Sequence, residues 1–110
     1  MQEQLNTLVE KIKEDYYNWQ GLSLDQEPHR VKVREDMIEN FNNSIDIHEG
    51  KKYIKIVCDR TVWGFVVNVD NDKKFRKGDI LKAAGYNAPA RNFARGNILD
   101  SGYTIKWPGA

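Results

Sequence analysis

The sequence predicts an α+β fold, with two N-terminal helices followed by an antiparallel sheet of about five strands. Apolar residues recur at helical spacing in the first 45 residues, whereas from residue 51 they alternate as in strands. Helices that precede the strands, rather than alternating with them, favour an antiparallel sheet. Such a sheet can curl into a small SH3-like barrel covered by helices on one face. The chain of 110 residues can bury one core, so we expect a single domain over 1–110, with a helical part (1–45) and a β-rich part (51–110).

Two amphipathic stretches predict the helices. The apolar residues of the first lie on one side of a helix that ends near Gly21, a typical stop residue: Leu5, Leu8, Val9, Ile12, Tyr16 and Trp19. The second helix is expected over residues 28–42, because Pro28 suits a first helical turn. Its apolar residues also keep helical spacing: Val33, Met37, Ile38 and Phe41. Val31 and Val33 in "RVKVR" alternate as in a strand, which is the competing interpretation.

The β-rich part begins with a predicted hairpin of strands 52–58 and 61–69, joined by the short connection Asp59-Arg60. "DNDKK" predicts a turn, and a third strand is expected around residues 79–83. Asn, Pro and Gly in "YNAPARNFARG" predict a loop. The last two strands are expected in "NILDSGYTIKW", with a turn at residues 100–102.

The composition argues against several classes of protein. No apolar run is long enough to span a membrane, and no signal peptide is recognisable. Cys58 is the single cysteine and is expected in or near the core, which favours a reducing cytoplasm. Only His29 and His48 accompany it, too few for a conventional zinc site, and no phosphate-loop or HExxH motif is present. "DNDKK" lacks the glycine and the distal glutamate of a calcium loop. We therefore expect a non-enzymatic protein with no metal and no cofactor.

The candidate binding segment runs from Lys74 to Leu99. Residues 73–97 carry seven basic side chains and one acidic one, whereas residues 1–50 carry five basic and eleven acidic ones. Arg and Lys neutralise phosphates, aromatic rings stack on bases and Asn amides pair with base edges. These residue types predict a ligand-binding surface made of Phe75, Arg76, Lys77, Lys82, Tyr86, Asn87, Arg91, Asn92, Phe93, Arg95 and Asn97.

Other interpretations of the same segment stay open. Lys and Arg also occur at solvated sheet edges, where they discourage aggregation. Asp79 could act as a base or a metal ligand, but a turn cap or salt bridge is the simpler role. Trp63 and Trp107 could extend a stacking platform or could belong to the core. The acidic and basic halves could also attract each other, within the fold or between subunits of a homo-oligomer.

The stretch "KFRKGDILKAAGYNAPARNFARGNI", preceded by "KKYIKIV…VWGFVV" and followed by "YTIKWPG", resembles a family of small proteins of tailed bacteriophages. The resemblance covers roughly residues 51–109, and the helical part is similar more loosely. It implies a virus and the cytoplasm of a bacterial host, but no activity and no catalytic residue. In that setting we expect nucleic acid or a nucleotide as the partner. The alternatives are a host protein that the chain inhibits or redirects, or a place as a minor virion component.

Overall fold

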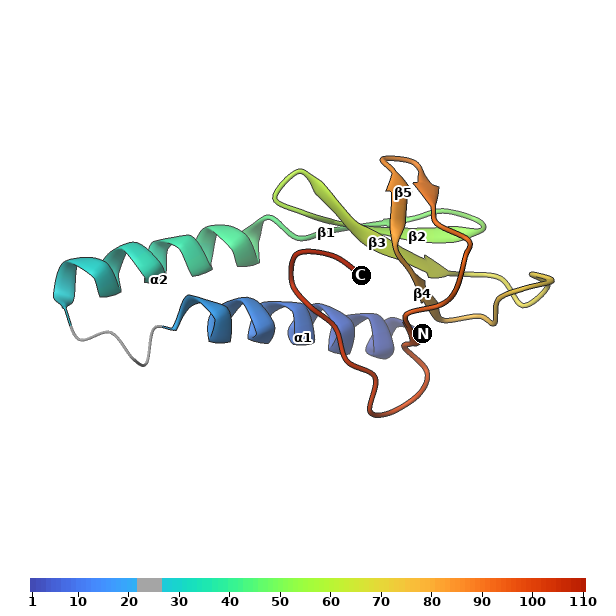
Figure 1. The fold of residues 1–110 in the computed structure, drawn as a ribbon, viewed down its shortest axis with the longest axis horizontal. Helices are drawn as coiled ribbons and strands as arrows, with labels where there is room; N and C mark the ends of the chain where they lie inside the picture. Colours follow the sequence, from blue (N-terminus) through green and yellow to red (C-terminus); the bar gives the residue numbers. More distant parts are fainter. Residues whose placement is uncertain (22–26) are drawn as a thin grey trace.

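The computed structural model describes residues 1–21 and 27–110 and confirms two helices followed by a five-stranded antiparallel sheet (Figure 1). The elements in chain order are α1 (Gln2–Gln20), α2 (Pro28–Asn43), β1 (Asp46–Glu49), β2 (Tyr53–Cys58), β3 (Thr61–Val67), β4 (Asp79–Leu81), β5 (Ala83–Gly85), β6 (Ala88–Pro89) and β7 (Gly96–Asn97). The main sheet has the order β1-β2-β3-β4-β7, and β5 and β6 form a small second sheet. Within the described residues β1 and β7 are the two edges and do not pair, so the main sheet is open and is not a closed SH3-like barrel.

The local signals of the sequence explain where the helices begin and end. Gly21 ends α1 in the left-handed conformation (φ 65°), and its N–H donates to the Asn18 carbonyl. The side chain of Glu27 caps α2 by accepting from the N–H groups of residues 29 and 30, and Pro28 occupies the first turn. The strand interpretation of "RVKVR" is therefore wrong, because these residues lie inside α2.

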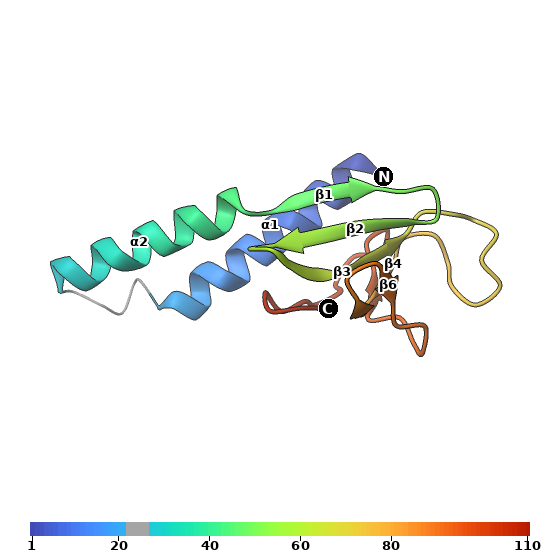
Figure 2. The ribbon, with the colours of Figure 1, turned by 90° about the horizontal axis from the view of Figure 1, so that it is seen from above.

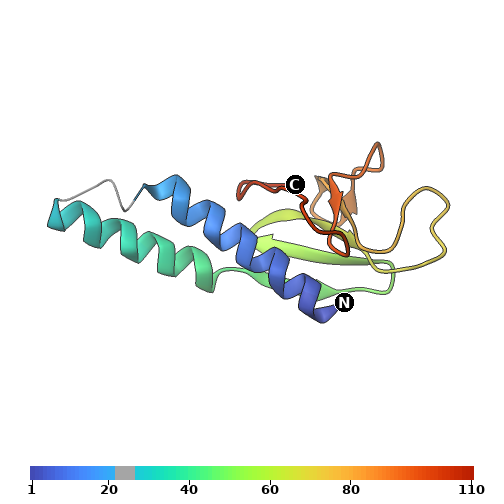
Figure 3. The same ribbon diagram turned by 90° about the horizontal axis from the view of Figure 1, so that it is seen from below.

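The main core lies between α1 and one face of the sheet (Figures 1 and 3). Leu8 and Ile12 of α1 are completely buried, as are Ile56 of β2 and Ile80 of β4. A smaller cluster around Phe65 forms a second packed group. In contrast, Phe41 is the one buried residue that α2 contributes, and both helices extend beyond the sheet (Figure 2). The molecule is consequently elongated, with extents of 53 × 27 × 24 Å.

The C-terminal segment differs most from expectation. The predicted hairpin in "NILDSGYTIKW" is wrong: β7 covers only Gly96–Asn97, and residues 98–107 contain no strand. This segment instead bonds to α1, since Lys11 donates to the Tyr103 carbonyl (3.1 Å) and the N–H of Trp107 donates to Asp15 (2.8 Å). The predicted loop "YNAPARNFARG" contains the short β5–β6 pair, and β1 was not expected.

The end of the chain packs on β3. The N–H of Ala110 donates to the Trp63 carbonyl (2.9 Å). A Cβ at Gly64 would lie 2.9 Å from both the Leu81 carbonyl oxygen and the Cβ of Ala110, so only glycine permits this approach. In the part of the chain that the structure describes, no helix is long and apolar enough to cross a membrane.

Candidate functional site

Two of the predicted site residues support the fold instead of facing solvent. Phe75 is 5% exposed and packs with Phe65 and Leu81, so its ring is not open to a stacking partner. Asn97 is 3% exposed. Its amide donates to the carbonyl of Lys77 (3.0 Å) and to Oδ1 of Asp79 (2.9 Å). Its Oδ1 accepts from the N–H of Leu99 (2.7 Å), so the amide is fully used within the protein.

Asp79 caps the turn that precedes β4. Its Oδ2 accepts from the N–H of Arg76 (2.9 Å), while its Oδ1 accepts from Asn97. The neighbouring Gly78 has φ 91°, in the left-handed region, and a Cβ there would lie 2.8 Å from Oδ1 of Asn97. These contacts agree with the turn-cap interpretation of Asp79.

The next two predicted cations form exposed ion pairs. Arg76 lies 2.7 Å from Asp100, and Lys77 lies 3.9 Å from Asp70. Exposed pairs of this kind stabilise a fold little and can exchange partners readily. Lys82, by contrast, is exposed and makes no ion pair with any described residue.

Arg91 holds the loop after β3. Its guanidinium donates to Asp72 (2.9 Å) and to the Tyr53 hydroxyl (2.5 Å), and it lies over the ring of Phe75, 4.9 Å from the ring centroid. Asp72 also accepts from the N–H groups of residues 74 and 75, and its side chain is only 2% exposed. The hydrogen bonds from Arg91 and then those from the two backbone N–H groups lower the pKa of Asp72 below its usual value. Its charge is thus compensated inside the protein.

The remaining predicted residues form two exposed groups. Lys55 lies 4.0 Å from the Tyr86 ring centroid and donates to Oδ1 of Asn87 (2.6 Å). The guanidinium of Arg95 lies 4.1 Å from the Phe93 ring centroid, and Oδ1 of Asn92 accepts from the N–H of Phe93 (2.9 Å). Tyr86 and Phe93 are 58% and 52% exposed, so each presents an aromatic ring next to a cation.

A basic hollow of about 470 Å³ lies at one end of the sheet, and four of its lining residues are cations. It is lined by Lys51, Lys52, Val69, Asn71, Asp72, Lys73 and Arg91. The β1–β2 turn and the loop after β3 meet here because alternate connections of an antiparallel sheet lie at the same end. Hydrogen bonds from Asn68 to the carbonyls of Gly50 and Lys52 join the two segments. The sequence analysis did not include the three lysines among the candidate site residues. Their signal is the pair of lysine doublets, "GKK" before β2 and "DKK" after β3.

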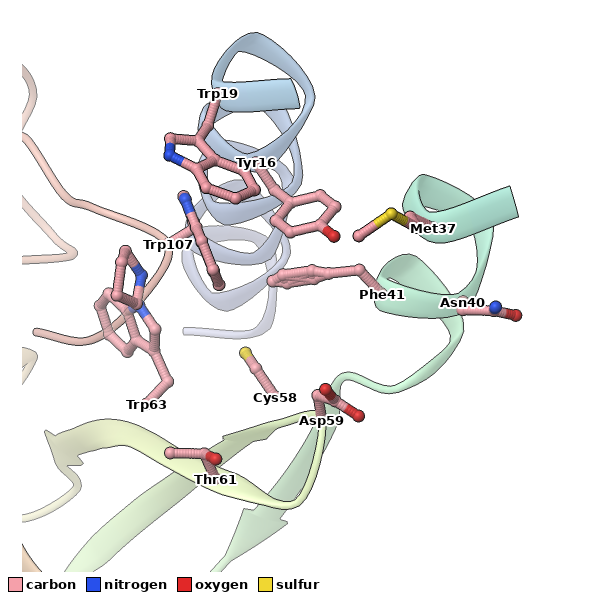
Figure 4. A pocket seen from close by; sticks show the side chains of 11 residues that line it. Tyr16, Trp19, Met37, Asn40, Phe41, Cys58, Asp59, Thr61, Trp63 and Trp107 are labelled. Carbon is pink, nitrogen blue, oxygen red and sulfur yellow. The ribbon is translucent and has the colours of Figure 1, made fainter. Parts of the chain in front are cut away.

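A second, aromatic hollow of about 530 Å³ lies where the two helices meet the tip of the β2–β3 hairpin (Figure 4). All three tryptophans of the chain line it, so Trp63 and Trp107 belong to this hollow and do not line the basic one. Trp63 is 1% exposed and donates from Nε1 to the Lys106 carbonyl, whereas Trp19 is 62% exposed. The described residues that line it are Tyr16, Trp19, Met37, Asn40, Phe41, Cys58, Asp59, Thr61, Trp63, Trp107 and Pro108.

The single cysteine and the two histidines lie apart from one another. Burial raises the pKa of the Cys58 thiol to about 12, so the thiol stays protonated at neutral pH and is a weak nucleophile. His29 lies in the first turn of α2 and His48 on β1, both exposed and outside the two hollows. Residues 1–21 and 27–110 contain no group of three or more His, Cys, Asp or Glu side chains that could hold a metal ion.

Comparisons of the chain with protein-family models, with curated proteins and with solved structures found no match.

Proposed function

We propose that the protein binds a phosphate-bearing partner, nucleic acid or a nucleotide, at the basic hollow and does so without catalysis. The observation that carries the proposal is the meeting of four cations from three separate segments in one hollow: Lys51, Lys52, Lys73 and Arg91. Within residues 1–21 and 27–110, the one acidic lining residue is Asp72, whose carboxylate is enclosed by Arg91 and two backbone N–H groups. The solvent-facing charge of the hollow is therefore positive, as a phosphate site requires.

The surrounding surface supports a partner larger than a single phosphate. Residues 51–110 carry twelve basic and five acidic side chains, so the positive field extends beyond the hollow. The Tyr86 ring beside Lys55 and the Phe93 ring beside Arg95 are exposed on the same half of the chain. An aromatic ring can stack on a base while the cation beside it contacts a phosphate of the nucleic-acid backbone, an arrangement typical of proteins that bind single strands. Together with the resemblance to small tailed-phage proteins, this favours an accessory protein that acts in the cytoplasm of a bacterial host.

The test is fluorescence anisotropy with a labelled single-stranded oligonucleotide, a labelled duplex and a labelled nucleotide at several salt concentrations. Arg91 is paired with Asp72, so the three lysines are the cations that can neutralise phosphates, and for a single strand they predict a slope of about −2 for log K against log salt concentration. The informative variant is the double substitution Lys51→Ala/Lys73→Ala. Its matched control is Lys13→Ala/Lys32→Ala on the helices, which changes the net charge equally and lies outside the basic hollow.

We expect the first double variant to weaken binding and to reduce the slope by about 1.4, whereas the control stays close to the native protein. Equal losses in both double variants would show a diffuse charge effect and would refute the site. If neither oligonucleotides nor nucleotides bind at low salt, the proposal fails, and the host-protein alternative takes its place.

A further inference from the structure

The aromatic hollow is an uncovered apolar surface at the base of the protruding helices. Trp19 and Met37, on its outer side, are 62% and 44% exposed. Figure 4 shows the side chains of Phe41, Trp107 and Trp63 grouped around the sulfur of Cys58. A hollow of this size and lining suits an apolar or aromatic side chain presented by another molecule.

The charge around the hollow indicates which kind of side chain fits. Among the residues that the structure describes, Asp59 is the one charged residue that lines it. The C-terminal end of α2 lies beside it, since the N–H of Asp59 donates to Oγ of Ser44, the residue that caps α2. α2 carries no basic residue in its last turn, so the negative end of its dipole adds to the charge of Asp59, whereas the end of α1 is compensated by Arg34, which donates to the Gln20 and Gly21 carbonyls. An aromatic group accompanied by a cation therefore matches this hollow best.

The chain itself presents such a group on another part of its surface. Phe93 is 52% exposed, and the guanidinium of Arg95 lies over its ring. The segment that carries this Phe93–Arg95 pair runs beside β4, because Ala90 and Arg95 donate to the carbonyls of Lys82 and Ile80. Neither Phe93 nor Arg95 lines the aromatic hollow of the same molecule.

We infer that the aromatic hollow receives the Phe93–Arg95 pair of a second copy of the chain, so that copies associate head to tail. Phe93 fills the hollow against Trp19, and Arg95 approaches Asp59. The opposite arrangement, in which helices of two copies face each other, brings together two segments of net charge −6 (residues 1–50) and is disfavoured. Because the two contacting surfaces differ, the contact is heterologous, and a pair of copies still has one free hollow and one free Phe93–Arg95 pair to which further copies can add. This inference uses none of the residues that line the basic hollow, but a single strand that stacks on Phe93 would compete with a second copy for the Phe93–Arg95 pair.

Light scattering after size exclusion, over a range of protein concentrations at low and high salt, tests the inference. We expect the mass to rise continuously above the 12.8 kDa of one chain with concentration, and to fall back as salt increases. Trp19→Ala and Phe93→Ala each remove one contact surface, and neither residue belongs to the buried core. Because the Trp19 ring also lies against Trp107 (centroids 4.9 Å apart), circular dichroism must show that Trp19→Ala keeps the native fold. Each should weaken self-association roughly tenfold or more, as expected for a central aromatic anchor. Tyr17→Ala and Tyr86→Ala are the matched controls, because both residues are exposed aromatics that do not line the hollow.

Mixing the two impaired variants gives the decisive result. Trp19→Ala keeps an intact Phe93–Arg95 pair, and Phe93→Ala keeps an intact hollow, so one contact can form between them and no further copy can add. The mixture should contain a one-to-one complex that stops at two chains, and the tryptophan emission should change because all three tryptophans line the hollow. A protein that is monomeric at every concentration at low salt would overturn the inference. Variants that behave as the native protein, or a mixture that stays monomeric, would do the same.

Discussion

Replacement of Asn97 by Ala separates a structural role for this residue from a ligand-binding one. The substitution removes hydrogen bonds to Lys77, Asp79 and Leu99 at a position that is 3% exposed. A hydrogen bond contributes about 1 kcal/mol net, so the loss of these contacts lowers the free energy of unfolding by about 3 kcal/mol. For a chain of this length that corresponds to a decrease in Tm of about 13 °C. Asn97→Asp should also destabilise, because it places a second carboxylate beside Asp79.

Thermal unfolding followed by circular dichroism measures this loss, and oligonucleotide anisotropy on the same samples measures binding. Asn92→Ala is the control, because Asn92 is exposed and bonds only locally to the N–H of Phe93, so its Tm should change little. A decrease of less than about 4 °C for Asn97→Ala would refute the structural argument. Loss of oligonucleotide binding with an unchanged Tm would show that Asn97 contacts the ligand and does not act through the fold.

Two further predictions follow from the ionisable groups. A thiol reagent at mild alkaline pH should label Cys58 slowly in the folded protein and rapidly in denaturant, because burial raises the pKa of the thiol to about 12. Rapid labelling of the native state would contradict this prediction. Asp72 has a folded pKa below the 3.8 of an unperturbed carboxyl, so it contributes stability above that pH and loses it as pH falls further. The Tm of Asp72→Asn should therefore be lower than that of the native protein at neutral pH, and the difference between the two Tm values should become smaller below pH 3.8. A Tm difference that does not depend on pH would show that the carboxylate charge does not contribute to stability.

The sequence predicted the parts of the fold that bury a regular apolar pattern. α1 and the β2–β3 hairpin carry strong periodic signals, and both formed nearly as expected. β1 was missed because "DIHE" contains one apolar residue, and an edge strand paired on one side needs no more. The predicted final hairpin failed for the opposite reason. Tyr103, Ile105 and Trp107 alternate with polar residues as in a strand. Their side chains pack against the main core, so they are partly buried although the segment pairs with no strand.

The candidate site was harder to predict because charge density along a sequence does not fix proximity in space. In the 74–97 segment, the Phe75 ring and the Asn97 amide are buried, and Arg76 and Lys77 form ion pairs. Tyr86 and Phe93 lie in two separate exposed groups, each beside a cation. The basic hollow combines Arg91 with lysines from two other connections, which only the sheet topology brings together. The aromatic hollow likewise depends on Trp107, whose place beside Tyr16 (centroids 4.9 Å apart) follows from the irregular end of the chain.

The contact between Gly64 and Ala110 has a consequence for how the sequence can diverge. Any side chain at position 64 meets a backbone carbonyl of β4 as well as the last residue, so no compensating change at position 110 alone can admit it. At position 110, in contrast, the atom that approaches Gly64 is the side-chain Cβ of Ala110, and the backbone N–H of this residue can bond to the Trp63 carbonyl whatever its side chain is. Among distant homologues, a glycine in the middle of β3 should therefore persist whatever residue stands at position 110, and it offers a marker of shared architecture where overall similarity has been lost.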